Sequence, residues 1–260
     1  MTVQCSYQKL RHSGFGLQRT LGSVPTLYSC RIMNWLVKLF SSSLGKKMLM
    51  SLTGIFLLTF LLVHLAGNLQ LLKPDGGRAF NEYAHFMGTN PLIQIVSKVN
   101  FIIISFHIVW AVILSISNRK ARGPVAYKKK DSSATPWSSR NMVVLGLIML
   151  AFIVIHLRHF WAETHYGNMG TVQYDGKMIP NLYALVAYWF SKTWYVSFYV
   201  FTMIAASFHL WHGIPSLFQT LGINHSKYNF GLMMVGKSMA ILIPGIFALI
   251  PLMMYISIRL

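Results

Sequence analysis

The chain has few charged residues, and acidic residues are the rarest of them. Asp and Glu together number 5 in 260 residues, against 23 Lys and Arg, while 54% of the residues are hydrophobic. A charged fraction of 11% is low for a soluble domain, and it predicts a polytopic membrane protein. The basic excess lies between apolar segments, as the positive-inside rule describes, so the net charge of +18 does not require a nucleic-acid partner and we expect none.

Cysteine is also scarce. The two cysteines, Cys5 and Cys30, both precede the first apolar segment and offer no disulfide framework. The chain contains no CxxCH motif for covalent haem attachment. Without CxxC pairs or a cysteine cluster, it is not expected to hold an iron–sulfur centre of its own.

Long apolar segments are the main positive feature. The segment from Met48 to Asn68 reads MLMSLTGIFLLTFLLVHLAGN and is long enough to cross the ~30 Å hydrocarbon core of a bilayer. Four similar segments follow, so we expect an all-α fold of five transmembrane helices, with the first four forming a bundle. The predicted spans are residues 48–70, 94–117, 141–162, 194–217 and 236–258.

The basic residues predict the orientation of these spans. Lys46 and Lys47 precede the first span, and the basic stretch NRKARGPVAYKKKD follows the second. Both ends are therefore expected on the cytoplasmic side of a cell inner (cytoplasmic) membrane, with the N-terminus inside and the C-terminus outside.

The N-terminal segment is expected to lie outside the membrane domain. Residues 1–32 are basic, contain no acid and predict a disordered extension before a domain at 33–260. Such a start resembles an organelle transit peptide or an extension upstream of the true start, and Met33, which opens MNWLVKLF, favours the second interpretation.

Each of the first four spans contains one deep histidine: His64, His107, His156 and His209. With alternating span directions and a rise of 1.5 Å per residue, His64 and His156 lie at an outer level. His107 and His209 lie at an inner level, about 10 Å away. Two imidazoles at one depth suit the axial positions of one haem iron, so the pattern favours two bis-His haems. A histidine proton relay is the competing interpretation, and the absence of acids within the spans counts against it.

Smaller residues fit the same arrangement. Gly54 and Gly146 each lie ten residues before an outer histidine, where they would admit the inner haem ring or allow close helix packing. His159 and His212 lie three residues after His156 and His209. Either could ligate in principle, but the deeper histidine of each pair is chosen, and the shallower ones are expected at the membrane interface or beside haem propionates and quinone.

Several motifs together resemble a known family. SLTGIFLLTFLLVHLAGN, FNEYAHFMGTNPLI, IVIHLRHFW and FHLWHGIPSLFQTLG are similar to the di-haem cytochrome b membrane subunit of succinate dehydrogenase/fumarate reductase, of the type with one five-span anchor. The resemblance covers residues 33–260. It implies haem b ligands paired between spans one and three and between spans two and four. It also implies an iron–sulfur subunit and a flavoprotein subunit on the cytoplasmic face, and electron exchange with menaquinone or another quinone.

The resemblance extends to individual positions. Ser51 matches a residue that contacts a propionate of the inner haem, and Trp137 and Arg140 precede span three at the same inner level. Arg140 suits either a propionate or an inside loop. Glu82, near His85, lies where some relatives place a quinone-site acid, and a solvated loop acid is the alternative.

One departure from the family is clear. Ser207 replaces the glutamate that some di-haem relatives carry two residues before the span-four ligand, which puts a transmembrane proton path at that position in doubt. The rival functions are a stand-alone di-haem electron carrier and a haem-free transporter with a histidine relay.

Overall fold

The computed structural model describes residues 37, 40–123, 137–167, 169–223 and 225–260. The chain divides into two compact units, residues 1–42 and 43–260, and the second contains the helices described below. The predicted extension 1–32 and both cysteines lie outside the described residues.

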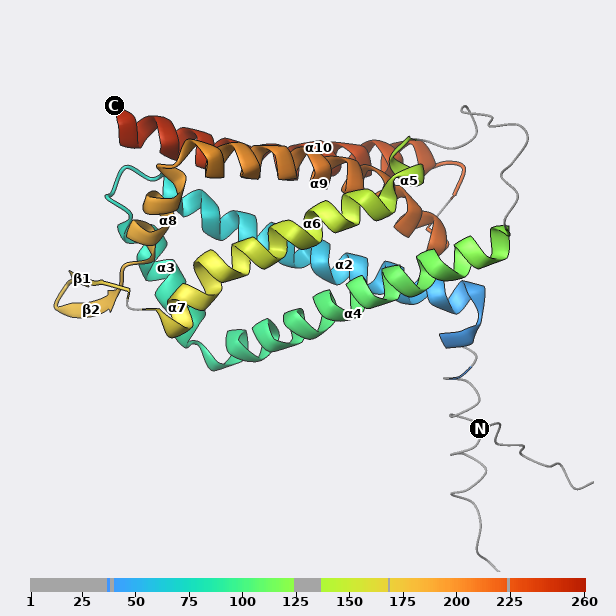
Figure 1. Ribbon diagram of the computed structural model, residues 1–260, viewed down its shortest axis with the longest axis horizontal. Helices are drawn as coiled ribbons and strands as arrows, with labels where there is room; N and C mark the ends of the chain where they lie inside the picture. Colours follow the sequence, from blue (N-terminus) through green and yellow to red (C-terminus); the bar gives the residue numbers. More distant parts are fainter. Residues whose placement is uncertain (1–36, 38–39, 124–136, 168, 224) are drawn as a thin grey trace, which may run out of the picture. The chain divides into compact units, whose positions relative to one another are not determined.

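Helices dominate the second unit (Figure 1). In chain order the elements are α2 (Ser43–Asn68), η1 (Leu69–Leu72), α3 (Arg78–Thr89), α4 (Pro91–Arg122), α5 (Trp137–Arg140), α6 (Met142–His156), the π-helical turn η2 (Leu157–Trp161), α7 (Ala162–Tyr166), β1 (Thr171–Tyr174), β2 (Lys177–Pro180), α8 (Leu182–Phe190), α9 (Thr193–Thr220) and α10 (Asn229–Arg259). A long helix lies over each of the five ranges that the sequence predicts, and the helices are mostly longer than those ranges.

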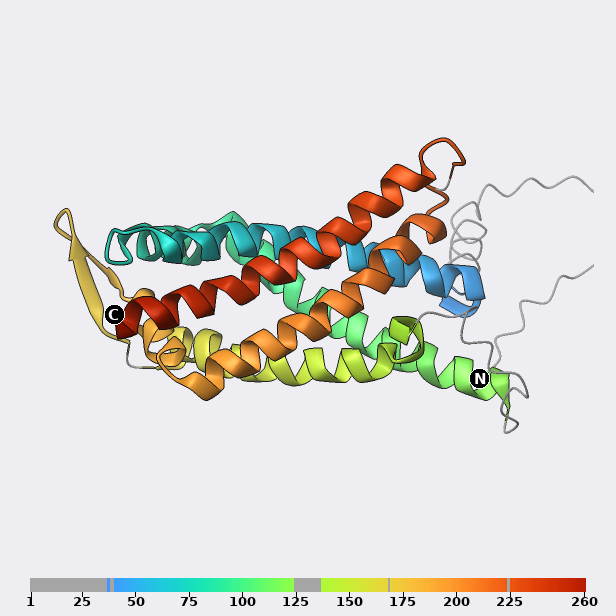
Figure 2. The same cartoon turned by 90° about the horizontal axis from the view of Figure 1, so that it is seen from above.

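Four of the long helices form a ring. α2 packs against α4 and α9, and α6 also packs against α4 and α9. α2 and α6 are therefore diagonal partners, as are α4 and α9. α10 lies outside this ring, against α9 and α2, and runs alongside α9 in Figures 1 and 2. The arrangement leaves the centre of the ring to side chains from four different helices.

Membrane-spanning character is present in four helices. The segments Ser43–Leu72, Pro91–Ala121, Met142–Tyr166 and Asn229–Arg259 are long and apolar enough to cross a bilayer, among the described residues. Ile102 on α4 and Leu147 on α6 are 68% and 59% exposed, as lipid-facing side chains of a membrane protein would be. The chain is thus a mostly helical, polytopic membrane protein by length and composition.

α9 has the length of a span but not the apolar composition. Its 28 residues include Trp, Tyr, Ser and His, and it packs against α2, α6 and α10. Tyr195 and Thr202 on α9 are fully buried. Polar and aromatic groups that face neighbouring helices lower the mean hydropathy of this helix, because they contact protein rather than lipid.

The two ends of the bundle differ. One end is called the hairpin end, because β1 pairs antiparallel with β2 there, beside α3 and α8 (Figure 1). The sequence pattern predicts no strand in this region. The four acids of the described residues all lie in its elements: Asp75, Glu82, Glu163 and Asp175. At the other end, called the α5 end, lie α5, the start of α2 and the end of α4, with Lys46, Lys47, Arg119 and Lys120.

Local sequence explains the main boundaries. The Asn90 side chain accepts hydrogen bonds from the backbone N–H groups of Leu92 and Ile93, and Pro91 occupies the first turn, where its missing N–H costs nothing. Gly123, with φ of 74°, ends α4. The main core cluster gathers α8, α9 and α10 toward the hairpin end. Its buried members are Leu65, Leu71, Phe80, Val186, Phe190, Tyr195, Val196, Tyr199, Ile243, Ile250 and Met254.

Candidate functional site

The four deep histidines sit on the four helices of the ring, one on each. His64 and His156 belong to the diagonal partners α2 and α6, and His107 and His209 belong to the diagonal partners α4 and α9. α2 and α6 run in the same direction, opposite to α4 and α9 (Figure 1). His64 and His156 therefore lie toward the hairpin end, and the other two histidines lie nearer the α5 end.

His64 and His156 are neighbours across the bundle. Their ring centres are 5.9 Å apart and their planes are nearly perpendicular, at 87°. Phe60 stacks on His64, Phe152 stacks on His156, and Phe247 of α10 also contacts His64. The pair that the depth argument predicts is thus together, inside an aromatic enclosure that limits water access.

His107 is held by a hydroxyl from the next helix. Thr53 Oγ1 on α2 lies 2.8 Å from His107 Nδ1 and 2.9 Å from the carbonyl of Met50. When the single hydroxyl proton is donated to the carbonyl of Met50, as is common for a threonine within a helix, Thr53 accepts from His107. Nδ1 then carries the imidazole proton, which leaves Nε2 with a free lone pair. This is the tautomer that an Nε2 metal ligand requires.

His209 has an unpartnered nitrogen. Its Nδ1 is buried and has no hydrogen-bond partner among the described residues, and the ring is close enough to His107 and His212 for electrostatic interaction. Buried polar atoms are normally hydrogen-bonded. The orphaned nitrogen indicates that the site around His209 is completed by a group other than these side chains.

The spacing of the histidine pair can be compared with that of two axial ligands on one metal. Within the described parts of the chain, no group of three or more His, Cys, Asp or Glu is placed to hold a metal. A haem iron takes only its axial ligands from the protein. With histidine–metal bonds of about 2.0–2.1 Å, two imidazoles on opposite sides of one metal have ring centres roughly 6 Å apart. The 5.9 Å between His64 and His156 is close to that spacing and also lies within the ordinary range for two rings in edge-to-face contact.

The two glycines that the sequence analysis selects lie beside open space. A Cβ at Gly146 would meet no atom within 4 Å, and a Cβ at Gly54 would meet only Leu217 Cδ1, at 3.9 Å. Close helix packing is therefore not the reason for either glycine. The close approaches occur elsewhere: a Cβ at Gly67 would collide with the Tyr83 ring, and one at Gly236 would lie 2.9 Å from Ile214. Other helical glycines, such as Gly213 and Gly245, have the same open space, so the space alone does not single out these two positions.

The residues predicted near the inner level have mixed settings. Ser51 is buried, and Trp137 stacks edge-on against Phe208, the neighbour of His209. Arg140 is exposed at the end of α5 and makes no ion pair among the described residues, so it is available to an anionic group. Ser138, which the sequence analysis did not select, is buried between the two α5 residues that it did.

His159 and His156 contact different hydroxyl groups of α9. The π-helical turn η2 begins directly after His156 and contains His159, and its wider turn changes the phase of the helix. The His159 ring stacks on Trp189 at 3.7 Å, and Nδ1 lies 3.2 Å from Tyr195 Oη. The expectation that either histidine of this pair could ligate depends on regular α-helical spacing, which is absent here.

Two of the three residues proposed for quinone, Glu82 and His85, lie apart from the bundle histidines. Glu82 and His85 are exposed on α3, and neither side chain hydrogen-bonds to or stacks on a bundle histidine in the described structure. Glu82 pairs with Arg78 at 2.8 Å, and Arg78 also binds Asp175. These two hydrogen bonds raise the pKa of the Arg78 guanidinium, which keeps Glu82 paired with a cation. The structure therefore brings His159, but not Glu82 or His85, into contact with the buried network.

Sequence reasoning missed the hydroxyl partners. Thr53 directly precedes Gly54, and Tyr195 and Tyr199 lie four residues apart in α9, ten or more residues before His209. A polar i, i+4 pair within an apolar segment is a usable signal, because such residues face protein rather than lipid.

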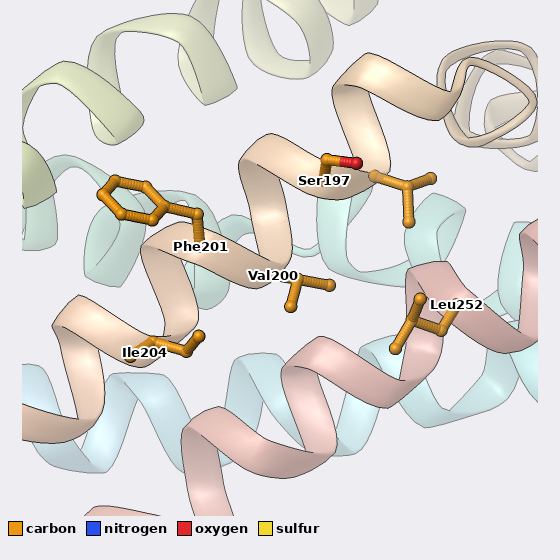
Figure 3. Close-up of a pocket in the computed structure, with 6 residues that line it drawn as sticks. Ser197, Val200, Phe201, Ile204 and Leu252 are labelled. Atoms are coloured by element: carbon orange, nitrogen blue, oxygen red, sulfur yellow. The ribbon is translucent and has the colours of Figure 1, made fainter.

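A surface groove beside α9 is a different feature. It has a volume of about 320 Å³, lies between α9 and α10, and is lined by apolar side chains such as Val200, Phe201 and Ile204 (Figure 3). Phe201 and Ile204 are more than half exposed, so the groove faces outward. It contains none of the predicted site residues.

Comparisons with known proteins find no relative of the chain. No protein-family model matches the chain, and searches of curated proteins and of solved structures likewise give no match.

Proposed function

We propose that the chain is the membrane anchor and di-haem cytochrome b subunit of a succinate:quinone oxidoreductase (succinate dehydrogenase/fumarate reductase). The observation that carries this proposal is the distribution of histidines over the ring. Each diagonal helix pair contributes one histidine pair, and the two pairs lie at different levels of the bundle. Four-helix bundles are common sites for cofactors held by facing side chains.

The histidines are the groups that would hold haem. His64 with His156, and His107 with His209, are the proposed axial ligands of two haem b groups. When bound, haem supplies one-electron chemistry between ferric and ferrous iron. The protein orients the imidazoles through Thr53 and Tyr199 and surrounds the outer pair with aromatic rings. Arg140 and Ser51 are proposed to hold propionates at the inner level.

The ends of the bundle suit different partners. The α5 end carries lysine and arginine residues, and we assign it to the cytoplasmic face of the inner membrane, where an iron–sulfur subunit and a flavoprotein subunit would dock. The hairpin end then faces outward and exchanges electrons with menaquinone or another quinone. This orientation requires α9 to cross the membrane as well, in addition to the four apolar helices. Its length of about 42 Å, at 1.5 Å per residue over 28 residues, is sufficient for that role.

The direct test uses the chain in its native membrane complex. A tagged chain is purified in mild detergent, and the b-haem absorbance is followed after addition of succinate and then of fumarate. We expect co-purification of a flavoprotein, reduction of the haems by succinate and reoxidation by fumarate. His107→Ala should interrupt succinate reduction of the outer haem, while His225→Ala, at an exposed histidine outside the long helices, should not. Haems that dicarboxylates leave unchanged would favour a stand-alone electron carrier.

A haem-free histidine relay remains the second candidate, because one observation favours it. His156, Tyr199, Tyr195 and His159 form a continuous hydrogen-bond chain. However, this chain stays at the hairpin end. Among the described side chains, no hydrogen bond links His64 or His156 to the level of His107. A transmembrane relay would need that link, whereas two separate haem sites would not.

A further inference from the structure

The hydrogen-bond chain at the hairpin end has four members on two helices. His156 Nδ1 lies 2.8 Å from Tyr199 Oη, Tyr199 Oη lies 3.3 Å from Tyr195 Oη, and Tyr195 Oη lies 3.2 Å from His159 Nδ1. Tyr195 is fully buried and Tyr199 is 6% exposed. The two tyrosines are therefore internal, and their hydroxyl groups bond to each other and to the histidines rather than to solvent.

Counting protons constrains the chain. Three hydrogen bonds need three protons, and two phenol hydroxyls supply only two. At least one imidazole must therefore donate from Nδ1. A neutral histidine that donates from Nδ1 keeps its lone pair on Nε2, and that nitrogen is then available to a metal.

Resting on the proposed function, we infer that Tyr199 and Tyr195 are positioning residues for the outer haem, which fix the tautomer of His156 and, through it, that of His159. If His156 ligates through Nε2, it donates from Nδ1 to Tyr199. Tyr199 then donates to Tyr195, and Tyr195 donates to Nδ1 of His159. Every proton in the chain is assigned, and His159 accepts at Nδ1 and carries its own proton on Nε2.

This polarity gives His159 a defined chemistry. Its Nε2–H becomes a hydrogen-bond donor, on a ring held against Trp189 with an angle of 19° between their planes. The carbonyl oxygens of a quinone accept hydrogen bonds and cannot donate them. A rigid imidazole donor at the hairpin end therefore matches the oxidised headgroup, and its tautomer is tied to the ligand of the neighbouring haem.

His159 lies in a π-helical turn. The turn runs from Leu157 to Trp161 and begins directly after His156. His159 reaches Tyr195 and His156 reaches Tyr199, one helical turn further along α9. Single π turns within α-helices are frequent at functional sites.

The test is a redox titration of the purified complex with electron paramagnetic resonance spectra of both ferric haems. Donation from Nδ1 raises the basicity of the ligand and stabilises ferric iron. Tyr199→Phe should therefore raise the midpoint potential of one haem and change its ferric spectrum, with the other haem unchanged. Tyr195→Phe keeps the His156 bond and should shift the same haem by less. Tyr255→Phe, which removes a 2.8 Å bond to Thr193 instead, should shift neither.

Each outcome separates this inference from the proposed function. Unchanged potentials and spectra in Tyr199→Phe, with both haems retained, would overturn the positioning role and leave the proposed function intact. If Tyr199→Phe loses a haem, the Tyr195→Phe variant decides. A shifted midpoint potential of its outer haem supports the positioning role of the hydrogen-bond chain, and an unchanged potential overturns that role. A wild-type protein without haem would remove the proposed function itself.

Discussion

Replacing Thr53 with valine should weaken one haem site without changing the shape of the bundle. Valine keeps the branched side chain of threonine but cannot accept the hydrogen bond from His107 Nδ1, which is 2.8 Å from Thr53 Oγ1. Thr53→Val therefore leaves a donor of His107 without its partner and removes the group that selects the ligating tautomer. The hydrogen bond from the Thr53 hydroxyl to the carbonyl of Met50 also disappears, but it lies within one helix and does not involve a histidine.

The expected magnitude follows from two independent estimates. Loss of a hydrogen-bond partner of a metal-bound histidine typically lowers metal affinity 10- to 100-fold. At about 1.4 kcal/mol per tenfold change, this corresponds to about 1.4–2.8 kcal/mol. An unsatisfied buried polar group costs about 1–3 kcal/mol. The two ranges overlap, so we expect a loss of about 2 kcal/mol in binding free energy at the inner haem site, from the tautomer and desolvation effects together.

The assay is the rate at which haem transfers from the purified protein to an excess of a haem-scavenging protein. Thr59→Val is the matched control, because Thr59 lies on the same helix, is exposed and bonds only to the carbonyl of Ile55, at 3.0 Å. Thr53→Val should release one of two haems at least tenfold faster than wild type, and Thr59→Val should match wild type. Equal release from the two variants would refute the reasoning about the His107 tautomer.

Three further predictions concern space and buried polarity. Gly146→Phe should lower the haem content from two to one per chain, measured as the pyridine haemochrome, while Gly245→Phe on α10, also beside open space, should keep both. Gly77→Ala should lower the free energy of unfolding by about 1–3 kcal/mol more than Gly76→Ala, since both glycines have positive φ but only at Gly77 would a Cβ meet a tyrosine ring; thermal unfolding in detergent measures the difference. Asn81→Ala should cost about 1–3 kcal/mol by the same measurement, because the side chain is 1% exposed and its oxygen accepts a backbone N–H across the fold.

The long helices and the histidine levels were predictable because each depends on a simple period. Apolar length marks four membrane-crossing segments, and the 1.5 Å rise converts sequence position into depth. The pairing of His64 with His156 follows from those two quantities alone, and the structure has their rings in contact. Their role as haem ligands remains a proposal, because depth says nothing of what lies between them.

The missed features depend on contacts between distant segments. The hairpin at residues 171–180 is held by Arg78 and by Asn81, more than 90 positions earlier, and no local pattern specifies such pairing. The π-helical turn after His156 has no local signal in the sequence, so the regular spacing assumed for His159 does not hold there. Glu82 illustrates the same limit, because its partner Arg78 lies four residues away but the Asp175 that completes the cluster does not.

The hydroxyl partners lie between these two cases. Thr53, Tyr195 and Tyr199 are visible in the sequence as polar groups within long helices, but only the packing of α2 on α4 and of α6 on α9 assigns each to a histidine. The sequence therefore identifies candidate ligands, whereas the hydroxyl partners from which the histidine tautomers are inferred become visible only in the structure. The same packing accounts for the low hydropathy of α9, which would otherwise argue against a fifth span.

The central claim is that two bis-histidine haems lie at two levels of one helix bundle. A dithionite-reduced minus oxidised spectrum of the purified protein, with a haem-to-chain ratio, tests it most directly when wild type is compared with His64→Ala and His107→Ala. The account predicts two low-spin b haems per chain in wild type and the loss of one haem, at a different potential, in each variant. A spectrum without haem, or variants that both keep two haems, would contradict it.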